Sequence, residues 1–347
     1  MCFLILFSLV RYACRLSLRV HYLPPYHLPT VTKRTVLSQM ARIFEPLGWL
    51  APITFYAKIF FRQLCLLHLE WDQPLSNESQ PSWLRFQSQL PTLAELHIPR
   101  FIPAVSSSAH QLIGFCDSSE SGYAAVVYLR SSTSSDQYHV SLLAAKSKIA
   151  PCKAVTLPRL ELCGAHLLAK IMHHLSTRVM PNLTTECIAF CDSSVALSWI
   201  RGESHRWKIF VGNRVAEIQD LVPSDCWRHV VSEDNPADCA SRGLMPADIH
   251  HHHLWWRGPP WPSLDASSWP LSSVDSSQIE QVEVEAKPIS TFMLAAISDE
   301  PTLIERFSSY LRLKRVTAFY RRFILNARNP SLPRSGFLLS SRRPRSV

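Results

Sequence analysis

The pentapeptide Phe-Cys-Asp-Ser-Ser occurs twice in the chain, at residues 115–119 and 190–194. Each copy closes a short apolar run, over 111–117 and 186–192, that predicts a strand. If the two strands are neighbours, Asp117 and Asp192 project from the same edge of one sheet. Carboxylates that close repel each other, and one stays protonated unless a cation lies between them. A hard divalent cation such as Mg²⁺ prefers oxygen ligands, so the repeat predicts a metal site at a sheet edge.

The sequence around the repeat predicts a complete α/β fold. Hydrophobic periodicity indicates a hairpin and three more strands, interleaved with helices. This order predicts a five-stranded mixed sheet with helices on both faces. The further strands are expected at 122–130, 139–149 and 226–231, and the helices at 157–175, 193–200, 206–219 and from 235 onward.

Two more acidic residues join the pair. Glu161 lies in the first turn of the 157–175 helix, and Asp238 in the first turn of the last helix. Four such acids can hold two divalent ions, Mg²⁺ or Mn²⁺, one activating a water and the other stabilising the leaving oxygen of a phosphodiester. Each position also has a plainer explanation. An aspartate before Ser-Ser is often a turn or helix cap, and an acid in a first helical turn often serves the helix dipole.

Four segments containing these acids resemble the ribonuclease H domain of BEL/Pao-type retrotransposon Pol polyproteins, the region of the Pao retrotransposon peptidase family. They read GFCDSSESGYAAVVYL, VTLPRLELCGAHLLAKI, IAFCDSSVALSWIRG and WRHVVSEDNPADCASRG. The resemblance places Asp117, Glu161, Asp192 and Asp238 on the four acidic positions of the ribonuclease H motif. It implies an endoribonuclease that cleaves the RNA strand of RNA–DNA hybrids by two-metal hydrolysis. A catalytically inactive remnant that binds nucleic acid is the alternative.

The flanks resemble other parts of the same polyproteins. TKRTVLSQMARIFEPLGWLAP is similar to the region after the reverse-transcriptase palm, and LWWRGPPW and a basic helix at 303–327 resemble the stretch toward integrase. No Asp-Thr/Ser-Gly of a protease and no paired-aspartate polymerase signature occurs, and no cysteine follows Cys239 to complete an integrase zinc site.

These resemblances and the composition of the flanks divide the chain into five segments. They are an irregular apolar N-terminus (1–29), a helical segment resembling the end of a reverse transcriptase (30–105), the ribonuclease H-like domain (110–245), a Trp/His/Ser-rich linker (246–300), and a basic helix with a tail expected to be disordered (301–347). Because a polymerase body would normally cover the helical segment, we expect Phe55, Phe60 and Phe61 to be partly exposed and to favour a partner chain, such as the rest of the polyprotein.

The formal net charge of +9 is concentrated near the two ends of the chain. Such basic flanks suit a polyanionic partner, although a solvated surface explains them as well. An RNA–DNA hybrid is read mainly through groove shape and phosphates. The best candidates for phosphate contacts are Arg201, His205, Arg206 and Lys208.

Four other residues have open roles. His229, on the last strand, is either a proton shuttle near the metals or, as we favour, a sheet-edge histidine. Trp199, Trp207 and Trp227 either stack on bases or fill the core, the latter favoured for Trp199 and Trp227.

The ten cysteines form no CxxC pair, which favours reduced thiols and a cytoplasmic location. The apolar residues 1–10 have the length of a signal-peptide core but lack a basic start and a cleavage site, and they are too short to span a membrane. We therefore expect no stable membrane association. A secreted or anchored product is the remote alternative.

Overall fold

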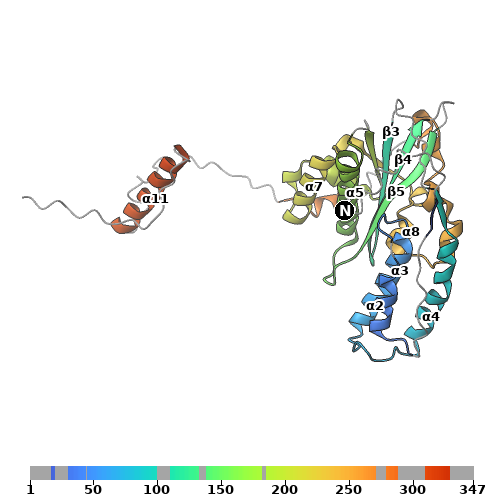
Figure 1. Cartoon of the computed structure of the whole chain (residues 1–347). Helices are drawn as coiled ribbons and strands as arrows, with labels where there is room; N and C mark the ends of the chain where they lie inside the picture. Colours follow the sequence, from blue (N-terminus) through green and yellow to red (C-terminus); the bar gives the residue numbers. More distant parts are fainter. Residues whose placement is uncertain are drawn as a thin grey trace, which may run out of the picture. The chain divides into compact units, whose positions relative to one another are not determined.

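A computed structural model describes residues 17–19, 30–43, 45–99, 110–132, 138–181, 185–270, 279–287 and 309–328. The chain divides into two units, 1–287 and 288–347, which are described separately (Figure 1). The apolar stretch 1–10 lies outside the described residues. Among the described helices, none is both long and apolar enough to cross a membrane.

The first unit is built on a five-stranded mixed sheet, as the sequence predicts. The strand order is β5-β4-β3-β6-β7. β3 runs antiparallel to β4 and parallel to β6, and β6 runs parallel to β7. The bounds are β3 (His110–Ser119), β4 (Gly122–Ser132), β5 (Tyr138–Ile149), β6 (Thr185–Cys191) and β7 (Trp227–His229).

The register between β3 and β6 aligns the two pentapeptides. Phe115 pairs with Phe190, and Cys116 pairs with Cys191. Side chains alternate between the faces of a strand, so equivalent residues of the two copies share a face. The parallel register therefore carries the next residue of each copy, an aspartate, to the same end of the sheet.

Three helices cover one face of the sheet. The leucines of the helix at 157–174 recur at helical spacing, and the apolar stripe that they form packs on Leu112, Cys116 and Val127. The helices are α5 (Leu157–His174), α6 (Ser194–Arg201) and α7 (Ile209–Leu221). The helix expected from 206 thus begins at 209, and the last strand is shorter than predicted.

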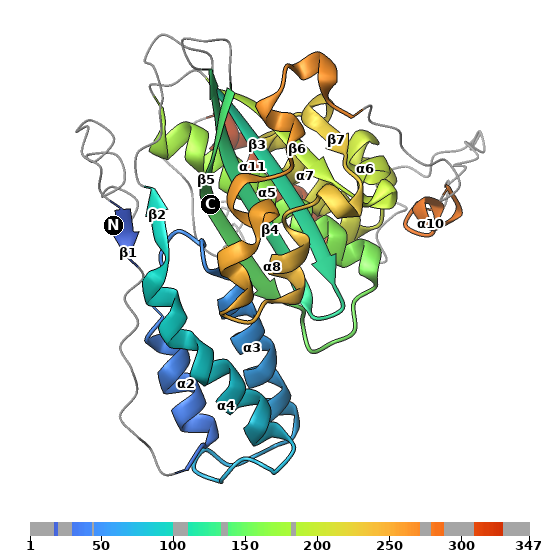
Figure 2. The same cartoon turned by 90° about the vertical axis from the view of Figure 1, so that its right-hand side faces the viewer.

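The helical segment packs against the opposite face, so the expectation of partly exposed phenylalanines is wrong for Phe55 and Phe60. Phe55 and Phe60 are buried, and Phe61 is partly buried against the same core. The reason is that α3 packs on β5 and on α8, the short helix Asp238–Arg242. Figure 2 shows α8 on the side of the sheet facing the viewer, with α3 next to it. The segment contains α2 (Lys33–Ala41), α3 (Ala51–Leu66) and α4 (Ser79–Gln89), and β2 (His97–Pro99) after them pairs with β1 (Ser17–Arg19).

A tight loop fixes α3 against the sheet. The carbonyl oxygen of Leu47 accepts a hydrogen bond of 2.9 Å from the N–H of Ala145 on β5. Gly48 has φ of +83°, and a Cβ built there would lie 1.6 Å from the carbonyl oxygen of Ala145. Only glycine combines this conformation with so close a backbone approach. The helical segment is thereby joined to the sheet through main-chain contacts.

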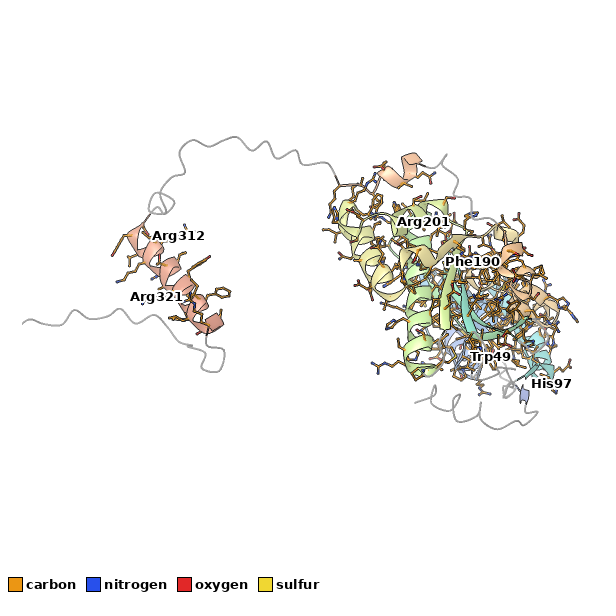
Figure 3. All side chains as sticks on the ribbon, turned by 90° about the horizontal axis from the view of Figure 1, so that it is seen from above. Trp49, His97, Phe190, Arg201, Arg312 and Arg321 are labelled. Carbon is orange, nitrogen blue, oxygen red and sulfur yellow. The ribbon has the colours of Figure 1, made fainter. Side chains whose placement is uncertain are left out.

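Part of the expected linker also belongs to the core. Residues 246–270, including α9 (His253–Arg257), lie on the same face as α3, and Trp255, Trp261 and Trp269 are buried there. The ring of Trp261 meets that of Phe190 edge-on at 4.9 Å between centroids. Figure 3 shows Phe190 among the interior side chains. Three tryptophan side chains carry too much apolar area to remain exposed in a solvated linker.

Two further helices follow. The short α10 (Ile279–Glu283) begins a strap over 279–287, in which Ala286 forms a β-bridge with Trp207. In the second unit, α11 (Tyr310–Arg328) occupies most of the range in which the basic helix was predicted.

Candidate active site

Asp117 and Asp192 meet where β3 and β6 end. Asp117 lies near the end of β3 and is only 3% exposed. Asp192 directly follows β6. Burial, together with the negative charge of Asp192, raises the pKa of Asp117 to about 8. The two carboxylates therefore interact strongly and disfavour simultaneous ionisation, as the repeat predicts.

Glu161 reaches the same point from the first turns of α5. It is 8% exposed, and its Oε2 has no hydrogen-bond partner among the residues that the structure describes. Its pKa is raised to about 9, first by burial and then by the charges of Asp192 and Asp117. A carboxylate oxygen of Glu161, one of Asp192 and the Sγ of Cys191 lie within 4.8 Å of one another.

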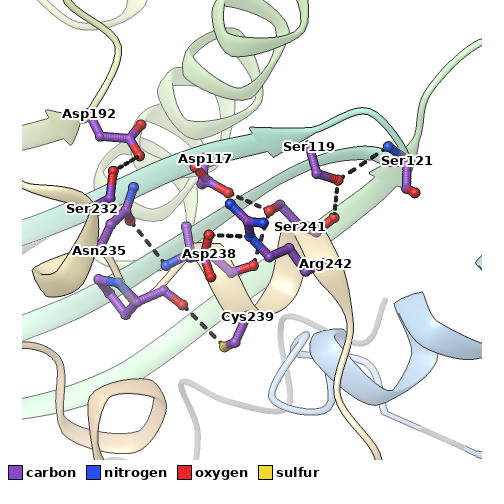
Figure 4. Close-up of polar contacts among 12 residues, drawn as sticks. Asp117, Ser119, Ser121, Asp192, Ser232, Asn235, Asp238, Cys239, Ser241 and Arg242 are labelled. Atoms are coloured by element: carbon purple, nitrogen blue, oxygen red, sulfur yellow. Dashed lines mark hydrogen bonds and ion pairs between the residues drawn. The ribbon is translucent and has the colours of Figure 1, made fainter. Parts of the chain in front are cut away.

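Asp238 lies on the more open side of this group. It begins α8, its side chain is 38% exposed, and its charge also raises the pKa of Asp117. One turn later in the helix, Arg242 forms an ion pair with it (Figure 4). The fold thus gathers the four acids singled out from the sequence. Glu161 and Asp192 lie close together, and the charge of Asp117 acts on Glu161 while those of Asp192 and Asp238 act on Asp117.

Residues 32–193 match the family described as Pao retrotransposon-like RNaseH-like domain. This part of the chain is a BEL/Pao retrotransposon RNase H-like region. The matched range of this Pao-type region includes α2, α3 and α4 as well as β3 to β6, in agreement with the packing of the helical segment on the sheet. Asp238 lies beyond the matched residues. No curated protein matches the chain.

Hydroxyl groups from one short segment of the chain hold two of the acids of the Pao-type region. The Ser241 hydroxyl donates to Oδ2 of Asp117 and lies 3.0 Å from the backbone oxygen of Asp238. The Ser232 hydroxyl donates to Oδ2 of Asp192 at 3.2 Å (Figure 4). Ser232 and Ser241 were not singled out from the sequence. The signal was the density of polar side chains around Asp238 in SEDNPADCASR.

Asn235, in the same segment, is fully buried and acts on the backbone. Its side-chain Nδ2 donates to the carbonyl oxygen of Cys116 at 3.0 Å, and its Oδ1 accepts from the N–H of Ala237. A buried amide needs such partners. Asn235 thereby connects the end of β3 to the start of α8, which positions Asp117 and Asp238 relative to each other.

His229 lies on β7, next to the acidic group. Its Nε2 is 3.2 Å from the backbone oxygen of Asp192. This contact fits the sheet-edge interpretation and leaves proton transfer as a proposal. Trp199, Trp207 and Trp227 are fully buried, so they fill the core and do not stack on bases.

The proposed phosphate-contacting residues are in contact with other parts of the chain, mainly the strap over 279–287. Arg206 forms an ion pair with Glu283, and the Nζ of Lys208 donates to the backbone oxygen of Val284 at 2.7 Å. The backbone oxygen of His205 accepts from Lys287 Nζ at 2.8 Å, and Arg201 donates to the backbone oxygen of Trp227 at 3.0 Å. The sequence did not predict these contacts with the strap over 279–287.

The acidic group fits a hard divalent cation. Oε2 of Glu161 and Oδ1 of Asp192 are both buried without a hydrogen-bond partner among the described residues. Buried polar atoms are normally paired, and an unpaired carboxylate oxygen in a group of like charges has the chemistry of a metal ligand. A cation there would also favour the ionised carboxylates, which burial and mutual repulsion disfavour.

Proposed function

We propose that the Pao-type region is a metal-dependent endoribonuclease that cleaves the RNA strand of RNA–DNA hybrids. The RNase H-like fold is a nucleic-acid-related hydrolase fold. The observation that carries the proposal is the convergence of Asp117, Glu161 and Asp192. Glu161 and Asp192 each have an unpaired buried oxygen, and the pKa values of Asp117 and Glu161 are raised. Strong pKa perturbation of grouped acids is characteristic of catalytic sites.

We propose Asp117, Glu161, Asp192 and Asp238 as the ligands of two divalent ions, Mg²⁺ or Mn²⁺. When bound, such ions supply an activated water and stabilise charge on the leaving oxygen. The residues of the chain orient the ligands. Ser241 fixes one oxygen of Asp117 and Ser232 one oxygen of Asp192, which leaves the other oxygens for the metal.

Arg242 and His229 act at the edge of this site in our proposal. Arg242 compensates part of the charge of Asp238 through their ion pair. His229, held against the backbone of Asp192, is positioned to exchange a proton with water near the scissile bond.

Arg201, His205, Arg206 and Lys208 remain the proposed phosphate-contacting residues. Arg206 keeps about half of its side chain exposed although it is paired with Glu283. Phosphates would compete with the strap for these donors, because both offer negatively charged or carbonyl oxygens to the same side chains. The described cysteines are free thiols, which suits the cytoplasmic site of action that we propose.

The test is cleavage of a duplex labelled on one strand by the purified chain in Mg²⁺. We expect cleavage of the RNA strand of an RNA–DNA hybrid, and none of double-stranded DNA. Asp117→Asn abolishes it, whereas the matched control Asp220→Asn, exposed on α7, does not. Hybrid binding with a steep salt dependence but no turnover would instead establish the alternative, a non-catalytic nucleic-acid-binding remnant.

A further inference from the structure

The acidic group contains a cysteine sulfur as well as carboxylate oxygens. Cys191 is the last residue of β6, and its Sγ lies within 4.8 Å of carboxylate oxygens of both Glu161 and Asp192. The backbone N–H of Ser193 donates to this sulfur at 3.4 Å. Three donors from three side chains therefore surround one point.

The unpaired oxygen of Glu161 provides a second, independent observation. Glu161 is more than nine-tenths buried, and its Oε2 has no hydrogen-bond partner among the described residues. Oδ1 of Asp192 is also a buried atom without a hydrogen-bond partner among the described residues, while Oδ2 accepts a hydrogen bond from Ser232. Both side chains that flank the sulfur thus offer a free oxygen for a ligand.

We propose that Glu161, Cys191 and Asp192 form a site for a thiophilic divalent cation, Zn²⁺, which excludes Mg²⁺ from the same carboxylates. Mg²⁺ takes oxygen ligands and gains little from a thiol, whereas Zn²⁺ binds cysteine sulfur and carboxylate oxygen together. The thiol releases its proton to solvent as the cation binds. The inference rests on the proposed function only for its consequence, which is inhibition of the Mg²⁺-dependent reaction by Zn²⁺.

The second copy of the pentapeptide supplies a matched comparison. Cys116 holds the position before Asp117 that Cys191 holds before Asp192, and the two cysteines are paired across β3 and β6. The Sγ of Cys116, however, is directed at the backbone oxygen of Phe190, at 3.5 Å, and does not belong to the three-donor group. Two equally buried cysteines of one motif thus differ in whether their sulfur belongs to the group formed with the carboxylate oxygens of Glu161 and Asp192.

The test uses Cd²⁺, which has the ligand preference of Zn²⁺ and gives an ultraviolet charge-transfer band when thiolate binds. The whole chain is titrated with Cd²⁺ in the absence of Mg²⁺, with a phosphine reductant. We expect Cys191→Ser to lose one equivalent of bound Cd²⁺ with its band, and Cys116→Ser to keep it. The other nine cysteines are common to wild type and Cys191→Ser, so the difference isolates one thiolate.

Glu161→Gln provides a second arm that leaves every cysteine in place. We expect it to weaken Cd²⁺ at the Cys191 site at least about tenfold, and excess Mg²⁺ to weaken it in the wild type. A band unchanged by Cys191→Ser, or an affinity unchanged by Glu161→Gln, overturns the proposal. If Cys191→Ser does not fold, Glu161→Gln decides alone.

Inhibition is measured separately. Zn²⁺ should stop Mg²⁺-dependent hybrid cleavage by the wild type, with Cys191→Ser resistant at the same Zn²⁺ concentration. Equal inhibition of both proteins would contradict exclusion of Mg²⁺ by this site. Should the wild type cleave nothing, the Cd²⁺ band still reports on the metal site, so failure of the proposed function and failure of this inference are distinguishable.

Discussion

The indole N–H of Trp255 donates a hydrogen bond of 2.8 Å to the backbone oxygen of Trp49. The indole of Trp49 in turn donates to the backbone oxygen of Leu143 on β5, at 3.0 Å. Trp49 precedes the strands of the sheet in the sequence and Trp255 follows them, yet both segments meet at β5. This relationship makes the helical segment and the tryptophan-rich segment parts of one folded unit with the sheet.

Substitution of Gly48 tests that joint. Gly48→Ala should destabilise the chain by at least about 2 kcal/mol, because its Cβ would overlap the backbone of Ala145 and the residue has positive φ. Gly258→Ala is the matched control, since Gly258 also has positive φ but a Cβ there would have no neighbour nearer than 3.8 Å. We expect a smaller loss for the control, measured by denaturant unfolding. Equal losses would show that the loop contact contributes nothing beyond the strain of positive φ.

Because the buried acids repel one another, Glu161→Gln should stabilise the metal-free chain at high pH. Because the pKa of Glu161 is raised to about 9 and that of Asp117 to about 8, their contribution to metal-free stability is full below about pH 4. It is lost as the pH rises through these raised values. Glu161→Gln should therefore melt at a higher temperature than the wild type at pH 9 in a chelator, and show less stabilisation by Mg²⁺. A metal-free variant less stable than the wild type at pH 9 contradicts the repulsion argued here.

Ser241→Ala removes the hydroxyl that holds Asp117. We expect the Mg²⁺ affinity, measured from the dependence of the melting temperature on Mg²⁺, to fall about 10- to 100-fold, as for other groups that orient metal ligands. Ser88→Ala serves as the control, since it removes a hydroxyl from α4 that bonds only to the backbone oxygen of Arg85 among the contacts described. The idea is refuted if both variants bind Mg²⁺ as the wild type does.

Charge removal on the strap tests the basic surface. Glu283→Gln releases Arg206 from its ion pair and should raise the affinity for hybrid about two- to fivefold at low salt, with little change in stability. Glu217→Gln breaks a similarly exposed pair with Lys170 and should leave hybrid affinity much less changed. An affinity unaffected by Glu283→Gln would mean that Arg206 serves only to hold the strap.

Much of the acidic site could be predicted because its signal is local. Each copy of the repeat places an aspartate at the end of an apolar strand, and a parallel register needs no further information to bring Asp117 and Asp192 together. Glu161 followed from the long amphipathic helix, whose apolar stripe must face the sheet. The five strands followed from short apolar runs rich in aromatic and β-branched residues.

The packing of the flanks could not be predicted in this way. Periodicity shows that α3 has a face to bury, but not which surface covers it, and the loop at Gly48 has no local signature of its contact with β5. The burial of Trp261 against Phe190 depends in the same way on residues far apart in the sequence. Ser241 was missed because the density of polar residues in SEDNPADCASR does not show which of its side chains contacts a carboxylate 124 positions away.

The most direct test of the central claim is the rate of hybrid cleavage across a Mg²⁺ titration, for the wild type and Asp192→Asn side by side. If Asp117, Glu161, Asp192 and Asp238 form a catalytic metal site, the wild-type rate rises with Mg²⁺ to saturation. Asp192→Asn, which keeps the shape of the side chain but not its charge, should then be slower by at least about 100-fold at every concentration. No Mg²⁺-dependent cleavage by the folded wild type, or equal rates for the two proteins, would contradict the account.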